Sequence, residues 1–234
     1  MWKFTGTAIL SATCALFSTG VAAQDSVRWG GGYLGAQVGY LDSNIGIDYE
    51  EDVGGFKSKS SPDANGTVGG VYGGYNWSSI GPWVFGVEGE YNWSSADGSG
   101  PEVEVFSLVP GANLGSYTTS LDATAALRAK IGYASGANLF YGTLGVAYVD
   151  YSVNYDNPAP VVPARRLSSN KIGWTVGLGY ERDLGNQWAG RIDYRYSDFV
   201  SATIGSGTVG TGTSYKFESD IEIHEIRIGL ARRF

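Results

Sequence analysis

The chain ends in the stretch His224-Glu225-Ile226-Arg227-Ile228-Gly229-Leu230-Ala231-Arg232-Arg233-Phe234, in which apolar and charged residues alternate. Successive side chains of a β-strand point to opposite faces, so this stretch predicts a strand with one apolar and one ionic face. The apolar face consists of Ile226, Ile228, Leu230 and Phe234. A water-soluble protein would turn the ionic face outward, whereas a membrane barrel turns the apolar face toward lipid and the ionic face toward its lumen.

The N-terminus is typical of an export signal. Lys3 supplies a positive charge, and the segment 4–17 is almost entirely apolar or small. We predict that residues 1–23 form a cleaved signal peptide and that residues 24–234 form the mature domain. Cleavage would remove Cys14, the one cysteine of the chain, and would leave neither disulfide nor thiol chemistry.

The composition favours a β-protein. The chain has 36 glycines and 32 aromatic residues (16 Tyr, 9 Phe and 7 Trp), and no run of 18 apolar residues follows residue 23. About 200 residues suffice for one domain. The mature net charge is −8, that is −7 with the charge of Lys3 removed, which argues against nucleic acid as a partner.

Period-2 patterning predicts eight strands whose connections alternate in length. The predicted strands are 32–41, 67–77, 83–93, 122–133, 138–149, 171–182, 188–198 and 223–234. The long connections are 42–66, 94–121, 150–170 and 199–222, and the short ones are 78–82, 134–137 and 183–187. All seven prolines fall in these connections, as a closed sheet requires. The sequence therefore predicts an all-β fold, an eight-stranded antiparallel up-and-down transmembrane β-barrel.

Charged residues recur on the inward face of these strands. The predicted lumen ion-pair network comprises Glu88, Glu90, Arg128, Lys130, Glu181, Arg191, Asp193, Arg195, Glu225 and Arg227. Eight strands enclose an interior that side chains just fill, and a paired cluster of buried charges is tolerable where a lone charge is not. We predict a salt-bridged, water-poor lumen; a narrow channel gated by rearranged ion pairs is the alternative.

Aromatic residues gather at both ends of the predicted strands, as membrane interfaces favour. The set beside the short connections or the N-terminus is Tyr33, Trp77, Trp83, Tyr133, Tyr180 and Trp188. The set beside the long connections is Tyr40, Tyr91, Trp93, Tyr148, Trp174 and Tyr196. We predict that these residues form two aromatic girdles.

These features resemble one protein family, the small outer-membrane β-barrel surface proteins of alphaproteobacteria of the OmpA/OmpX and opacity-protein type. The matching stretches are Gly-Val-Tyr-Gly-Gly-Tyr-Asn-Trp at 70–77, Leu-Arg-Ala-Lys-Ile-Gly-Tyr at 127–133, Ile-Gly-Trp-Thr-Val-Gly-Leu-Gly-Tyr at 172–180, and the terminal Phe234. The resemblance implies an outer-membrane location and a C-terminal insertion signal read by the barrel-insertion machinery, here Ile226, Ile228, Leu230 and Phe234. Arg232 departs from the outward aromatic residue that the family usually has.

The resemblance also raises other activities. Some eight-stranded barrels act on lipid A with histidine and serine at the outer rim, and relatives are implied to bind haem or to mediate adhesion through their loops. This chain has one histidine, His224, with Glu222 and Glu225 nearby, but Ile226 stands where a serine would be expected and Ser219 is the nearest serine. We therefore expect no catalytic residues, no metal and no cofactor.

Charge in the long connections suggests partners outside the cell. The connections 42–66, 94–121 and 199–222 carry −4, −3 and −2, and 150–170 is neutral. The acidic segment 48–52 lacks the spacing of a calcium loop, so we read it as a solvated acidic segment. We expect contact with outer-membrane lipid and lipopolysaccharide, bridged by divalent cations or made directly by Arg165 and Arg166, and possible host or environmental ligands at the loops. The leading function is a structural, surface-exposed barrel that supports envelope integrity and acts in adhesion or as an antigen.

Overall fold

The computed structural model describes residues 29–51, 57–60, 63–101, 103–106, 116–156, 165–209 and 213–234, and the predicted signal peptide lies outside these ranges. In the described residues the strands are β1 (Gly31–Glu51), β2 (Lys57–Ser60), β3 (Ala64–Ile80), β4 (Trp83–Pro101), β5 (Val103–Phe106), β6 (Ser116–Ser135), β7 (Asn138–Asp156), β8 (Arg165–Gly185), β9 (Trp188–Val209) and β10 (Thr213–Arg233). Within the same ranges, no helix has the length and apolar character needed to cross a membrane.

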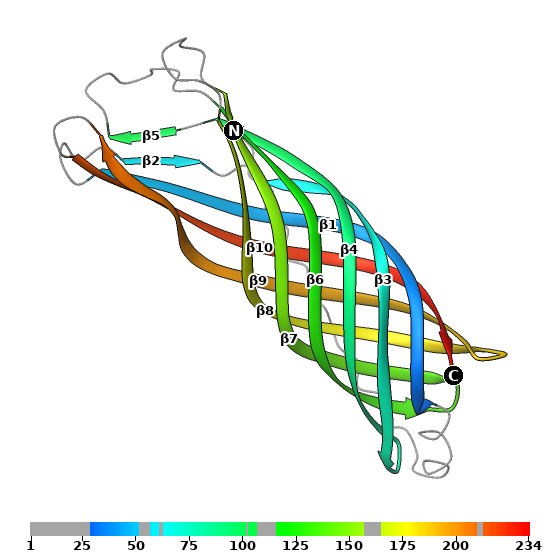
Figure 1. The fold of residues 1–234 in the computed structure, drawn as a ribbon. Coiled ribbons are helices and arrows are strands. Elements are labelled where there is room, and N and C mark those ends of the chain that lie inside the picture. The colour runs from blue at the N-terminus through cyan, green and yellow to red at the C-terminus, as the bar shows by residue number, and fades with distance from the viewer. Residues whose placement is uncertain are drawn as a thin grey trace, which may run out of the picture.

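Eight long strands close into an antiparallel barrel (Figure 1). Their circular order is β1, β3, β4, β6, β7, β8, β9, β10 and back to β1, and each strand pairs with its neighbours in sequence. The closing seam runs from Tyr33 paired with Arg233 to Glu51 paired with Tyr215. The predicted eight-stranded up-and-down barrel is confirmed.

Three two-residue turns join strands at one end of the barrel, which we call the turn end. These turns are 81–82, 136–137 and 186–187. Gly81 and Gly136 adopt φ of 61° and 60°, a region open to glycine without steric cost, while Asn186 and Gln187 adopt 50° and 68°. The C-terminus lies at the same end, and β2 and β5 lie at the other, the loop end (Figure 1).

The strands are longer than the sequence predicted. β9 runs to Val209 and β10 begins at Thr213, so the predicted connection 199–222 is almost entirely strand. Likewise β1 continues to Glu51 through most of the acidic segment 48–52. One proline lies in a strand after all, because Pro101 is the last residue of β4. These extensions were missed because their sequences do not continue the period-2 apolar row that marks the first part of each strand.

Near the turn end the two faces have the predicted polarity. All ten side chains of the predicted ion-pair network are buried, and large apolar side chains on the outward parity are exposed. Examples of the outward set are Leu127, Leu144, Ile172, Leu178, Ile226 and Ile228. On β7, Phe140, Leu144, Val146 and Tyr148 point outward.

Toward the loop end this polarity reverses within the same strands. On β10 the inward series passes from Arg227 and Glu225 to Ile223 and Ile221, and all four are buried. Apolar side chains from several strands form a buried cluster there: Leu41, Ile45, Ala64, Val68, Ala96, Leu121, Ala147, Val149, Tyr151, Val153, Phe199, Ile221 and Ile223. The outward positions in this part include Asp42, Asp97, Asp122 and Asp220, which are exposed. The outer wall therefore faces an apolar medium near the turn end and water near the loop end.

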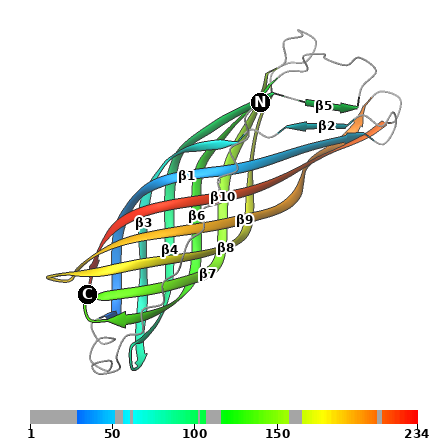
Figure 2. The same cartoon turned by 180° about the vertical axis from the view of Figure 1, so that it is seen from behind.

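The barrel wall also divides toward the loop end. The last pair between β8 and β9 is Trp174 with Asp198. Beyond it β8 stays paired with β7 as far as Arg165, and β9 stays paired with β10 as far as Val209. From behind, β9, β10 and β1 are seen to lean away from β6, β7 and β8 (Figure 2).

Candidate functional site

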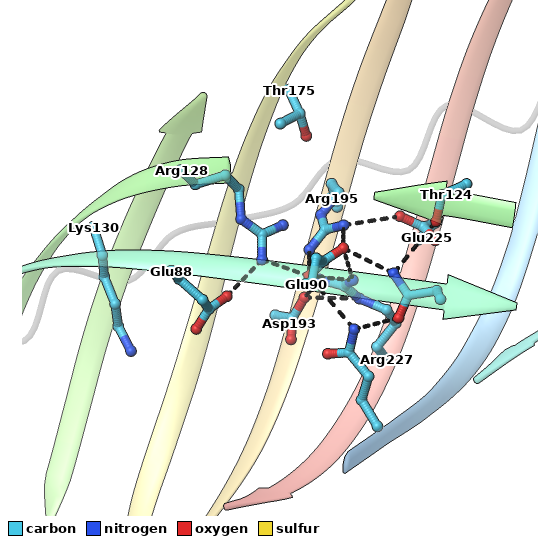
Figure 3. Close-up of polar contacts among 12 residues, drawn as sticks. Glu88, Glu90, Thr124, Arg128, Lys130, Thr175, Asp193, Arg195, Glu225 and Arg227 are labelled. Atoms are coloured by element: carbon cyan, nitrogen blue, oxygen red, sulfur yellow. Dashed lines mark hydrogen bonds and ion pairs between the residues drawn. The ribbon is translucent and has the colours of Figure 1, made fainter. Parts of the chain in front are cut away.

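Glu90, at the centre of the lumen, is shared by three arginines (Figure 3). Its carboxylate accepts a hydrogen bond from Arg128 at 2.7 Å and from Arg227 at 3.0 and 3.1 Å, and it also accepts from both terminal nitrogens of Arg195. Asn92 donates to the same carboxylate at 2.9 Å. The Glu90 side chain has no exposed surface, so these donors replace its hydration shell.

Ion pairs cross the lumen between opposite strands. β4 and β9 are four steps apart in the circle of eight long strands, which makes them diametrically opposed. Arg191 on β9 nevertheless donates to Glu88 on β4 at 2.8 Å, and Arg195 on β9 contacts Glu90 on β4. Arg128, which pairs directly with Glu88 in the β4–β6 register, donates to it at 2.5 Å. Guanidinium and carboxylate groups therefore meet on the barrel axis.

The remaining predicted network residues continue this layer around the wall. Arg227 donates through Nε to Asp193 at 3.1 Å, and Arg195 lies 3.5 Å from Glu225. Lys130 donates to Glu181 at 2.6 Å, and its ammonium lies 4.1 Å from the centre of a tyrosine ring at position 141. All ten predicted side chains are buried, and we call this set the ion-pair layer. Ion pairs connect eight of them into one network, and Lys130 and Glu181 form a separate pair.

Neutral side chains that sequence reasoning missed complete the ion-pair layer. Gln37 donates to Asn92 at 2.6 Å and accepts from Arg191, and the guanidinium carbon of Arg191 lies 3.4 Å from the centre of the Tyr72 ring. Tyr33 donates to Glu88 at 2.9 Å. The strand parity of β1 carried a usable signal, since Gln37 has the inward parity opposite to the apolar row of that strand.

Tyr33 corrects one of the girdle predictions. It was predicted in the girdle of the turn end, but it is only 6% exposed and points into the lumen. Leu34, Val38 and Tyr40 are the outward side chains of β1, so an odd-numbered residue of this strand faces inward. The sequence-based prediction placed Tyr33 correctly near the end of the strand. It did not take into account that the odd-numbered residues of this strand face inward.

The other eleven predicted girdle residues lie on the outer wall or at its edge. Exposed ones are Trp77, Trp83, Tyr133, Trp188, Tyr40, Tyr91, Trp93, Tyr148 and Trp174, and Tyr180 and Tyr196 are half-buried. Several pack in pairs across neighbouring strands, such as Trp83 with Tyr133 at 5.5 Å and Trp174 with Tyr196 at 5.3 Å between ring centres.

Close packing leaves little room beside the ion-pair layer. A small cavity next to Glu88 and Arg128 is too narrow to admit a water molecule. Inward glycines provide the space for the long side chains, because a β-carbon on Gly39 would lie 2.5 Å from Cγ of Arg227, and one on Gly145 would lie 2.8 Å from Cγ of Arg128. The lumen is therefore filled at this level by side chains.

A second group of side chains fills the turn end of the lumen. Trp29, which precedes β1, is 1% exposed and packs in a cluster with Val84, Ala134, Leu139, Tyr141 and Ala189. The guanidinium of Arg233 lies 4.8 Å from the centre of the Trp29 ring and pairs with Asp183 at 2.7 Å. Sequence reasoning did not identify Trp29, because it stands outside the period-2 pattern.

The single histidine lies on the outer face, where its partners are tyrosines. Nδ1 of His224 is 2.8 Å from the Tyr194 hydroxyl, and its ring centre is 5.1 Å from that of Tyr196. Asp42 is its cross-strand partner on β1. Ser219 is the nearest serine in the sequence, and its side chain is not among those that the structure describes.

Two further sequence-based expectations concern residues whose side chains lie outside the described ones. These are the acidic segment 48–52 and the arginine pair Arg165 and Arg166, although the backbone places both arginines at the start of β8. Within the described part of the chain, no group of three or more His, Cys, Asp or Glu residues is arranged to hold a metal ion.

A closed barrel with a charged interior and an exposed apolar wall agrees with the comparisons with known proteins. The family model described as "Outer membrane protein beta-barrel domain" matches residues 11–234. The chain belongs to this outer membrane β-barrel family. It is similar to the 31 kDa outer-membrane immunogenic protein of Brucella melitensis biotype 1, with 29% identity over 248 residues that cover 97% of this chain and 98% of the relative. The 22 kDa outer membrane protein of Rhizobium leguminosarum bv. viciae is 29% identical over 208 residues, which cover 88% of this chain and 78% of the relative.

Solved structures share the fold of this outer membrane barrel. The outer membrane protease OmpT of Escherichia coli matches with a TM-score of 0.58 at 10% identity, and the match covers 87% of this chain and 97% of OmpT. The outer membrane protein OprG of Pseudomonas aeruginosa matches with a TM-score of 0.55 at 15% identity, covering 88% and 97%. At these identities the likeness lies in the fold.

Family and structure together place the protein in the outer membrane as a surface barrel. The apolar wall near the turn end is then the lipid-facing wall, with aromatic side chains at its borders. Short turns of such barrels face the periplasm and long connections face outward, so the turn end is periplasmic and the loop end is extracellular.

Proposed function

We propose that this protein is a structural barrel of the outer membrane whose lumen is closed. We further propose that it contacts its partners through the extracellular extension, the part of the strands that continues beyond the lipid-facing wall toward the loop end. The observation that carries this proposal is the pairing of β9 arginines with β4 glutamates straight across the lumen. Such a pair occupies the barrel axis, where a diffusing solute would have to pass. Opening a path would separate buried charges, at a cost of several kcal/mol for each ion left alone.

The extracellular extension supports a role in presenting surface. The strands continue beyond the lipid-facing band with apolar side chains turned inward and carboxylates such as Asp42, Asp97 and Asp122 turned outward. Paired strands restrict the motion of the connections that join them. The extension therefore presents these connections from a rigid part of the barrel. Envelope support, adhesion and recognition as an antigen all use such a surface.

We expect partners on both sides of the membrane. Outward carboxylates just above the lipid-facing band repel the phosphates of lipopolysaccharide unless divalent cations bridge them. On β10 the side chains of Ile226, Ile228 and Leu230 are exposed on the lipid-facing wall, and Phe234, which directly follows the strand, is exposed as well. We expect the barrel-insertion machinery to recognise this row of apolar side chains. Host or environmental ligands would bind at the extracellular connections.

Uptake of sugars into liposomes tests the closed lumen. Wild-type protein is expected to give no faster swelling than liposomes without protein, because the ion-pair layer blocks the axis. The double variant Arg191→Ala, Arg195→Ala removes both crossing arginines and is expected to raise the rate. Swelling by the wild type at the rate of an open porin would favour the channel alternative.

A catalytic role is the second candidate, and the environment of His224 argues against it. Its Nδ1 is engaged by the Tyr194 hydroxyl on the outer wall, so neither serine nor a carboxylate occupies that position. We propose that His224 is an interfacial polar residue. Lipid A from cells that express wild type or His224→Ala should have the same mass; a modified species that disappears in the variant would overturn this proposal.

A further inference from the structure

A groove interrupts the lipid-facing wall near the periplasmic end. It has a volume of about 380 Å³ and spans β4, β6, β7 and β8. Its outward lining residues are Trp83, Ile131, Tyr133, Phe140, Gly142 and Leu178. Gly142 stands between Ile131 and Leu178 in the strand register, so the missing side chain of Gly142 leaves a gap between two large apolar neighbours.

An exposed arginine lies below this groove on the same strand pair. Three successive outward pairs join β7 and β8: Gly142 with Leu178, Phe140 with Tyr180, and Asn138 with Arg182. At a rise of about 3.3 Å per residue, Arg182 lies roughly 13 Å from the Leu178 position along the strand. Strands of such barrels tilt by about 35–45°, so this separation corresponds to roughly 10 Å along the membrane normal, which lies within one leaflet, about half of the ~30 Å hydrocarbon core.

The wall between the groove and Arg182 is built to meet a lipid headgroup region. The Phe140 and Tyr180 rings pack with their centres 5.2 Å apart, and the Tyr180 hydroxyl donates to Asn138 at 2.7 Å. Asp183, the neighbour of Arg182 in sequence, pairs with Arg233 at 2.7 Å. Arg182 therefore presents a positive charge at the level of the periplasmic headgroups, beside an aromatic pair that marks the membrane interface.

We propose that this surface binds an anionic phospholipid of the periplasmic leaflet, with its phosphate on Arg182 and one acyl chain in the groove at Gly142. A guanidinium binds a lipid phosphate in a bidentate manner. Charge complementarity then favours an anionic headgroup, because a zwitterionic headgroup also brings a cation that Arg182 repels. The groove volume lies at the low end of the range of about 300–1,000 Å³ for small-molecule sites, which suits a single hydrocarbon chain. The site lies on the outer wall, so it is independent of the closed lumen.

Lipid retention tests the site. The full-length barrel is reconstituted in bilayers of equal phosphatidylglycerol and phosphatidylcholine and released into mild detergent, and the lipids that stay bound are counted by native mass spectrometry. We expect wild type to retain phosphatidylglycerol at least several-fold over phosphatidylcholine. Arg182→Gln is expected to lose this preference, whereas Arg232→Gln, which changes an exposed arginine of β10 away from the groove, keeps it. Equal retention of both lipids by wild type, or equal effects of the two arginine variants, would overturn the proposal.

A second pair of variants tests the groove itself. A β-carbon on Gly142 would have its nearest neighbours at 3.8 Å, so Gly142→Leu fills the groove without strain, and it is expected to reduce retention of both lipids. Gly89→Leu is the matched control, because Gly89 lies in a comparable open position on β4, with its nearest neighbour at 3.9 Å, outside the groove. Heat-modifiable gel migration verifies that each variant folds. Unchanged retention in Gly142→Leu, or a dimer that this variant disrupts, would contradict lipid as the occupant.

Discussion

The guanidinium of Arg195 on β9 contacts the carboxylate of Glu90 on β4, although these strands stand on opposite sides of the barrel. Most pairs in a sheet join neighbouring strands and stabilise only the local ladder. A pair across the axis instead joins two halves of the wall and occupies the space between them. The same contact therefore bears on stability and on whether the lumen conducts.

Glu90→Gln tests the contribution of the central carboxylate to stability. The change leaves Arg128, Arg195 and Arg227 without their shared anion, and breaking a buried pair costs about 3–5 kcal/mol. Urea unfolding in lipid vesicles, followed by gel migration, should show a loss of this size. Asp97→Asn, at an exposed position of the same strand, should change the free energy of unfolding by less than about 0.5 kcal/mol. Equal effects of the two variants would show that the ion-pair layer does not stabilise the barrel.

A lysine on the lipid-facing wall tests where the hydrocarbon lies. Ile228 is 58% exposed near the middle of the apolar row of β10, so Ile228→Lys should cost about 2–4 kcal/mol in unfolding free energy. Glu222→Lys changes the same face of the same strand above that row, and near an interface the cost falls to about 0–1 kcal/mol. A smaller cost at residue 228 than at residue 222 would contradict the assigned membrane position.

Cysteine labelling of intact cells tests the same boundary from outside. A membrane-impermeant maleimide is expected to label Asp97→Cys, because Asp97 is exposed on the extracellular extension of β4. Val87→Cys, on the same face of β4 but within the lipid-facing row, should stay unlabelled until the membrane is dissolved. Labelling of both positions in intact cells would mean that the apolar row does not face lipid.

The terminal aromatic residue provides a test of insertion. Phe234 is 77% exposed at the end of the outward row of β10, so the folded barrel gains little packing from it. Phe234→Ala keeps the backbone hydrogen bonds that residue 234 makes with Gly32. It should slow assembly by the insertion machinery several-fold while leaving the unfolding free energy nearly unchanged, and Phe234→Tyr should assemble normally. Assembly of the Phe234→Ala variant at the wild-type rate would show that this aromatic ring is not part of the insertion signal.

The barrel and its ionic interior could be predicted because two physical constraints act on the same strands. A strand within lipid must expose an apolar row, and the opposite row then faces the lumen. The alternation of Ile226 and Arg227 along the chain therefore predicts that Ile226 faces lipid and Arg227 faces the lumen. The glycines of the tight turns, Gly81 and Gly136, also mark the strand ends in the sequence, because such turns require a positive φ.

Other features lay beyond this reasoning because they depend on three-dimensional closure. Which arginine meets which glutamate is set by the circular order of the strands, which brings Arg191 to Glu88 over 103 residues of sequence. The strand extensions were predicted as loops. Outside the membrane polar side chains are compatible with a strand and with a loop, so the sequence does not distinguish the two there. Trp29 follows no strand period, and only the closed barrel provides the cluster that buries it.

Single-channel recording in a planar bilayer tests the central claim most directly. Purified wild-type monomer should give no steady openings, because Arg191 and Arg195 bridge to Glu88 and Glu90 across the axis. Replacing both arginines by alanine should produce openings under the same voltage. Steady, large unitary conductance from the wild-type monomer would contradict a lumen closed by these ion pairs.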